Sequence, residues 1–207
     1  MKKGVVLLFT AFLFGLGISF AQDSDQINVQ AVQLENGSLM GYLTANATNP
    51  NTDTNCYAKA SNPETSYNCL VGALQKTGLD KALADKGSFT LFAPTDQAFK
   101  VYATAAGETA FHDLVNSPDT LSALLKYHVL PKAFTLDDLY YMASGLNGTT
   151  TLPTLEGQNL AIHFSGNSGG NTMSSVTLGS AHALAPTMVF NNGNLISIDD
   201  VVALPAS

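Results

Sequence analysis

Apolar residues between about residue 66 and residue 85 recur three and four positions apart, as they do on one face of an amphipathic helix. One apolar stripe runs from Leu70 to Thr77, and Gly78 follows it as a typical C-terminal cap. A second, shorter helix is predicted over residues 81–85, with Asp80 as its cap. The pattern therefore predicts two consecutive helices at the start of a folded domain.

A further helix is predicted to begin at Ser117 and to end before Pro131. A Ser cap, Pro118 in the first turn and an acidic residue after it are the usual signals of a helix start. The apolar face of this helix is formed by Leu121, Leu124, Leu125 and His128.

A strand followed by a sharp turn and a helix is predicted between Phe89 and Phe99. Four apolar-rich residues, Phe89–Phe92, have the composition of a buried strand, and Pro94 ends it. Thr95 and Asp96 can cap a new helix whose first apolar residues come directly afterwards. Asp96 can alternatively be considered as a catalytic acid, but its position at a helix start favours the cap.

After about residue 149 the helical pattern gives way to short alternating runs separated by Gly, Asn and Ser, which predicts strands. The predicted strands are residues 151–155, 160–164, 175–178, 187–190 and 195–198. Asn192-Gly193 is typical of a hairpin turn. Helices first and strands later indicate an α+β domain, and no internal repeat is present.

Residues 22–65 form a polar N-terminal extension rich in Asn, Thr, Gln, Ser and Asp, with little to bury. Scattered apolar residues between Val29 and Leu43 are compatible with a docked helix or strand. The pattern leaves open whether this segment docks on the domain.

The first 21 residues have the pattern of a secretory signal peptide. Two lysines are followed by an uncharged apolar run, and Ser19 and Ala21 provide small residues before Gln22. A transmembrane anchor is the alternative, which the small residues at the end of the run disfavour. We therefore expect a secreted protein, either extracellular or located in the periplasm or at the cell surface.

Without residues 1–21 the chain keeps seven lysines against sixteen acidic residues, a net charge of −9, and it contains no arginine or tryptophan. Arginine and a positive surface are the usual means of phosphate recognition, so this composition disfavours nucleic acid as a partner.

The two cysteines of the chain, Cys56 and Cys69, are expected to form a disulfide in a secreted protein, with two free thiols as the alternative. Closing this loop would contribute about 3 kcal/mol of stability on chain-entropy grounds. Its expected role is to tie the extension to the first helix of the domain.

No catalytic or metal-binding motif is apparent. The four histidines lie far apart in sequence, so no metal is expected, and no nucleophile-elbow motif occurs. Asp199 and Asp200 are adjacent on a predicted strand and would point to opposite faces, while Asp137 and Asp138 resemble the first turn of a short helix. A hydrolase is therefore the least favoured function.

Asn36, Asn46 and Asn147 each begin an Asn-x-Ser/Thr glycosylation sequon. The chain is rich enough in Asn, Ser and Thr for chance to supply as many, so their use is left open.

Three segments together resemble the fasciclin-type domain family. Phe89–Phe99 closely resembles the first signature box of that family, and Leu125–Pro131 resembles its Tyr-His motif. Asn191–Pro205 resembles the second box. The resemblance implies a fasciclin-type domain over residues 66–206, with a wedge-shaped β-sandwich and helices packed around it.

The sequence departs from the second box at two positions. Ser197 stands where the family commonly has His, and Asn194 stands where an aliphatic residue is common. A ligand or metal role of that histidine therefore does not transfer to this chain.

The resemblance implies a non-enzymatic module for cell adhesion or extracellular-matrix interaction, without a cofactor. The implied partner is an extracellular protein or a cell-surface or matrix component, and self-association is a variant of this function. Tyr127 and His128, in the Tyr-His motif, and Thr95 and Asp96, at the first box, are the candidate partner-binding residues, on an edge expected to be exposed. The alternative for His128 is a core residue whose ring nitrogens bind neighbours such as Asp96 or backbone groups.

A soluble carrier for a small apolar ligand, such as a carotenoid, is the alternative function. Secretion, acidity and a surplus of Met and aliphatic residues in the later strands and loops motivate it, although the same residues also suit a protein core. The sequence names neither the partner nor the ligand.

Overall fold

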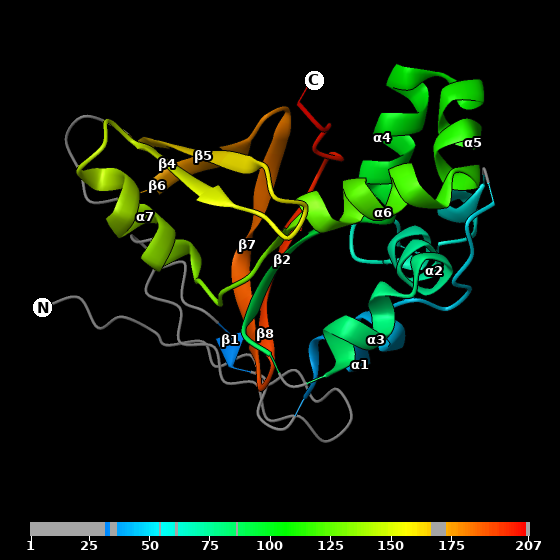
Figure 1. Ribbon diagram of the computed structural model, residues 1–207, viewed down its shortest axis with the longest axis horizontal. Coiled ribbons are helices and arrows are strands. Elements are labelled where there is room, and N and C mark those ends of the chain that lie inside the picture. The colour runs from blue at the N-terminus through cyan, green and yellow to red at the C-terminus, as the bar shows by residue number, and fades with distance from the viewer. Residues whose placement is uncertain are drawn as a thin grey trace, which may run out of the picture.

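The computed structural model describes residues 32–33, 37–53, 55–60, 62–85, 87–166 and 173–205 (Figure 1). The predicted signal peptide and the sequon at Asn36 lie outside these residues.

Helices dominate the first two thirds of the described chain and strands the last third. The helices are α1 (Leu39–Ala45), the 3-10 turn η1 (Cys56–Lys59), α2 (Asn68–Thr77), α3 (Leu79–Ala84), α4 (Asp96–Ala106), α5 (Glu108–Asn116), α6 (Pro118–Tyr127) and α7 (Leu136–Ser144). The strands are β1 (Val32–Gln33), β2 (Phe89–Pro94), β3 (Val129–Leu130), β4 (Thr149–Pro153), β5 (Asn159–Gly166), β6 (Met173–Leu178), β7 (Ala181–Phe190) and β8 (Gly193–Ile198). The predicted α+β class is confirmed.

The strands form one mixed sheet in the order β3-β2-β8-β7-β6-β5-β4, with β1 parallel to β7. Strand β7 pairs with β6 at its start and with β8 along its length, and its register with β8 shifts between Leu184 and Met188. The sheet therefore divides at β7 into two halves that diverge, with α7 on one side and the other helices on the other (Figure 1). The backbone N–H of Leu155 donates to Val129 O at 2.8 Å and brings the β4 end of the sheet back to β3.

Two hydrophobic clusters fill the fold. The larger cluster joins α1 to α6 with the face of β2 and β8, and Leu74 and Phe111 are among its fully buried side chains. The smaller cluster lies among α7, β5 and the other side of β2 and β8, with Leu139 and Ile162 at its centre. Strands β2 and β8 are buried on both faces, which explains why their sequences read as nearly continuous apolar runs.

The N-terminal extension docks on the domain, which the sequence left open. Leu39 and Leu43 of α1 are buried in the larger cluster, and the N–H of Leu39 donates to Asn192 Oδ1 at 3.0 Å. The predicted disulfide is present between Cys56 of η1 and Cys69 of α2, so it ties the extension to this helix. The described residues 46–53 contribute no strand or helix, as their polar composition predicts.

Other local predictions differ from the structure in instructive ways. The helix after Pro94, whose end was not predicted, stops at Ala106, where Gly107 adopts a φ of +89° and a separate helix, α5, follows. The strand predicted over residues 187–190 is the end of a longer strand that begins at Ala181. The hairpin predicted from Asn192-Gly193 is confirmed, but its turn residues are Asn191 and Asn192, because Gly193 already begins β8 and pairs with Phe190.

Gly72 lets the extension approach α2, and we expect Gly72→Ala to destabilise the protein by about 1–3 kcal/mol. A methyl group at this position would overlap the backbone of Asn51, which outweighs the gain of up to about 1 kcal/mol in helix propensity. Urea denaturation monitored by circular dichroism measures the change. Gly145→Ala is the matched control because its methyl group would meet open space, and equal stability of both variants would contradict the close approach.

Candidate functional site

Asp96 and Thr95 cap two different helices. Thr95 is the N-cap of α4, and its hydroxyl accepts from the N–H of Ala98 at 3.3 Å, as predicted. Asp96 was predicted to cap the same helix, and this is wrong. Its carboxylate accepts from the N–H of Cys69 at 2.9 Å and from Asn68 Nδ2 at 2.8 Å, so it caps the neighbouring helix α2.

The buried carboxylate of Asp96 links three segments that lie far apart in the sequence. Asn68 donates to it and also accepts from the N–H of Asn49, at 2.7 Å, in the extension. Burial raises the pKa of Asp96, and the hydrogen bonds from Cys69 and Asn68 oppose this shift. The chemistry of the group is therefore that of a structural acceptor held between α2, α4 and the extension.

Ser197, which replaces the common second-box His, has a structural partner. Its hydroxyl lies 2.7 Å from the hydroxyl of Tyr67, and both side chains are buried. Burial raises the pKa of Tyr67 to about 12, so the phenol stays protonated. This pair ties the start of α2 to β8.

His128 joins the end of α6 to the C-terminal segment of the chain. Its side chain is only 1% exposed; Nδ1 donates to Leu124 O at 2.8 Å, and Nε2 accepts from the N–H of Val202 at 3.0 Å. Because Val202 must donate, the ring is neutral and carries its proton on Nδ1. Burial lowers the pKa of His128 to about 4, against the raising effect of the Leu124 carbonyl.

The interpretation of His128 as a core histidine is confirmed, with backbone groups as both partners and without Asp96. Tyr127 is also buried, its hydroxyl donates to Asn159 O at 3.2 Å, and burial raises its pKa. The expectation of an exposed edge at Tyr127 and His128 is wrong, because the end of α6 packs on the sheet there. A role of these residues, with Thr95 and Asp96, in partner binding stays a prediction.

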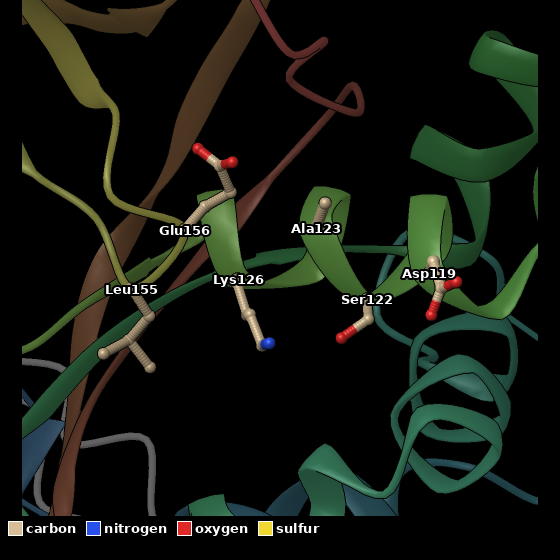
Figure 2. A pocket seen from close by; sticks show the side chains of 6 residues that line it. All are labelled: Asp119, Ser122, Ala123, Lys126, Leu155 and Glu156. Carbon is tan, nitrogen blue, oxygen red and sulfur yellow. The ribbon is translucent and has the colours of Figure 1, made fainter.

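An open groove lies along the outward face of α6, and it was not predicted from the sequence. Figure 2 shows its lining side chains on α6 and on the turn that follows β4. The volume of the groove is about 220 Å³. Its lining residues are Asp119, Ser122, Ala123, Lys126, Leu155 and Glu156. The helical spacing of the first four was the available signal, but the turn that completes the groove is a tertiary neighbour.

The paired carboxylates considered from the sequence do not form a joint site. Asp199 accepts from the backbone N–H of His182 at 2.6 Å and from its ring at 3.1 Å. Asp200 accepts from the N–H of Val201 at 2.8 Å, and Asp138 forms a capping box with Thr135 at the start of α7. Asp199, Asp200 and Asp138 therefore each have a local structural partner.

Across the described ranges, no three His, Cys, Asp or Glu side chains gather in a way that could hold a metal ion. Within the same ranges, no helix combines the length and apolar character needed to cross a membrane.

The carrier hypothesis, with an apolar ligand such as a carotenoid, stays a prediction. The groove on α6 is open, carries three charged side chains, and is smaller than the roughly 300–1,000 Å³ of typical ligand pockets. It therefore offers the carrier hypothesis no support.

Comparison with known proteins places the matching region in the α+β domain. A family model described as the Fasciclin domain matches residues 65–205. The pig protein "Transforming growth factor-beta-induced protein ig-h3" is 30% identical over 138 residues, which cover 67% of this chain and 18% of that protein. Human periostin is 29% identical over 127 residues, which cover 61% of this chain and 13% of periostin. The chain thus spans less than a fifth of the length of these two relatives.

A cyanobacterial relative has a more similar size. An uncharacterised protein of Synechocystis is 29% identical over 135 residues, which cover 65% of this chain and 87% of that protein. Among solved structures, a FAS1 domain pair from the insect cell adhesion molecule Fasciclin I aligns with a TM-score of 0.56 and 18% identity. That alignment covers 70% of this chain and 48% of the domain pair, and it shows a shared fold.

We expect acid to destabilise the protein through His128. The pKa is 6.5 in the unfolded chain and about 4 in the fold, so the unfolded state binds more protons between these values. Stability should therefore fall as the pH drops from about 6.5 to 4, by about 3 kcal/mol in total, and this contribution should stay constant above pH 6.5. Urea denaturation at a series of pH values, compared with His128→Gln, isolates the effect; an identical pH slope in the variant would argue against it.

Asp96→Asn should lower the free energy of unfolding by about 1–3 kcal/mol at pH 7. An amide can offer only one oxygen, so either Cys69 or Asn68 loses a buried acceptor. Asp113→Asn, at an exposed position on α5, is the control and should change stability by less than about 0.5 kcal/mol. Equal effects of the two substitutions would show that the cap on α2 is dispensable.

Proposed function

Because the chain belongs to the fasciclin domain family, we propose that it is a secreted, non-enzymatic module for cell adhesion or extracellular-matrix interaction. The observation that carries the proposal is the shared fold with a domain pair from an insect cell adhesion molecule, together with the family match over residues 65–205. The signal-peptide pattern at residues 1–21 supports secretion, and the net negative charge makes a nucleic-acid partner unfavourable.

The architecture suits a binding scaffold. The larger hydrophobic cluster includes residues from the extension and from the last strand, and a disulfide ties the extension to α2. The side chains of Asp96 and His128, in the signature segments, form internal hydrogen bonds. A partner would therefore bind the outer surface of a rigid body.

Within this proposal, Thr95, Asp96, Tyr127 and His128 act on partner binding indirectly. Their side chains are buried, so they hold the strands and helices whose outer residues a cell-surface or matrix component would contact. These four residues would therefore support the binding surface without contacting the partner themselves.

Beads coated with the secreted protein should bind cells or purified extracellular-matrix proteins, and beads coated with the reduced, unfolded protein should not. Tyr127→Phe removes only the hydroxyl that donates to Asn159 O, so it should leave the fold intact and change binding less than twofold. Flow cytometry of bead–cell complexes measures the binding. Failure of the folded protein to bind any of these surfaces above the unfolded control would overturn the proposal.

The location is tested separately. Expression of the full chain in a secreting host should release protein whose first residue is Gln22, as determined by N-terminal sequencing of the medium. Retention of the uncleaved chain in the membrane fraction would support the anchor alternative and contradict secretion.

A further inference from the structure

Helix α6 carries a charge pattern that is complementary to itself. Asp119 lies near the start of the helix, Lys126 lies near its end, and Ser122 and Ala123 lie midway between them. At 1.5 Å per residue the two charged positions are about 10 Å apart along the helix axis. All four residues fall on one outward stripe, because the spacing i, i+3, i+4 and i+7 repeats the helical turn.

The charges of this stripe form no ion pair within the described part of the molecule. No carboxylate there lies within 4.0 Å of the Lys126 ammonium group, and Asp119 is exposed. Figure 2 shows Asp119, Ser122 and Lys126 one turn apart along α6, projecting to the same side of the helix. An acid near the start and a base near the end of a helix also interact favourably with the helix dipole. On an isolated helix this effect alone would explain the positions of Asp119 and Lys126.

We propose that this stripe is the contact surface for a second copy of the chain, packed with the two α6 helices antiparallel about a twofold axis. The midpoint of residues 119 and 126 falls between Ser122 and Ala123, so the axis passes between two small residues. Each Asp119 then lies opposite the Lys126 of the other copy, and the same contact occurs twice.

The surroundings of the stripe fit a shallow, reversible contact. Ser122 and Ala123 permit two helices to approach closely, and Leu155, which is 39% exposed at the rim of the groove, adds apolar area. Exposed ion pairs contribute little each, and a contact of one helix and one turn lies at the small end of protein interfaces. The dimer should therefore be weak, and many copies displayed on one surface would bind those on another by multivalency.

This inference takes its biological meaning from the proposed adhesive function, for which it names the same chain as partner. Its test in solution does not depend on that function. A monomeric protein that still binds matrix would refute the α6 contact alone, and a dimer that binds no surface would refute only the matrix function.

Charge reversal separates the contact from the alternatives. Sedimentation equilibrium of the secreted protein at about 0.15 M salt, where the Debye length of about 8 Å screens the net negative charge, should show a concentration-dependent dimer. Lys126→Glu or Asp119→Lys should each raise the dissociation constant by about tenfold or more, because every substitution makes two contacts repulsive. The combined variant should restore association, since the two charges remain opposite across the axis.

The combined variant is decisive because it reverses the charges relative to the helix dipole. If the charges served α6 alone, this variant would be the worst of the three, and its thermal unfolding should be compared with that of the single variants. Asp113→Lys and Lys132→Glu, at exposed positions on other segments, are controls with the same changes in net charge and should leave association unchanged.

A symmetric cross-link locates the axis. Ser122→Cys should form a disulfide-linked dimer under mild oxidation, whereas Thr104→Cys, an exposed position on α4, should not. The native cysteines are already paired and buried, which keeps them out of the exchange. A protein that stays monomeric at the highest soluble concentration, a combined variant that fails to associate, or equal cross-linking at both positions would each overturn the proposal.

Discussion

The fold depends on one buried carboxylate placed where three segments meet. Asp96 belongs to the first turn of α4, yet it satisfies the N-terminus of α2, and through Asn68 it reaches the extension at Asn49. Its own backbone N–H donates to Ser66 O at 2.8 Å, so Asp96 both accepts from and donates to the segment at the start of α2. A buried charge without a nearby cation is costly, and here it is stabilised by donors that the α2 terminus would otherwise leave unpaired.

The sequence predicts this region well where the determinants are local. Phe89–Pro94 is apolar and ends in proline, so the strand and the following helix could be predicted, as could the Thr95 cap and the existence of the β7–β8 hairpin. The partner of Asp96 could not be predicted from periodicity, because Cys69 lies 27 positions earlier and meets it only after the helices pack. The partners of His128 could not be predicted for the same reason. Helical spacing indicated a core position, but Val202, which donates to its ring, lies 74 positions away in the sequence.

The outer surface was the least predictable part. The groove on α6 needs the turn at Leu155 and Glu156. The backbone hydrogen bond from Leu155 to Val129 O and the bond from the Tyr127 hydroxyl to Asn159 O hold this part of the chain near the end of α6. The docking of the extension was only partly predictable. Its polar composition resembled a tether, and its apolar residues up to Leu43 allowed a docked element without showing where it packs; Leu39, Leu43 and Cys56 are buried in the core. In this chain the signature residues Asp96 and His128 form internal hydrogen bonds. The contact proposed on α6 instead uses residues whose side chains line the outer groove.

The parallel pairing of β2 and β8 also has a mechanical consequence. The register holds from Phe89 opposite Gly193 to Pro94 opposite Ile198, and the chain continues from β8 directly into the C-terminal segment. Tension applied at that end would pull β8 along its own axis, so the rungs shared with β2 would be loaded together in shear. When two paired strands are pulled in shear, all their hydrogen bonds must break together, whereas a hairpin peeled from one end loses its hydrogen bonds one by one. A tether attached beyond residue 205 would therefore pull on the strongest direction of the sheet.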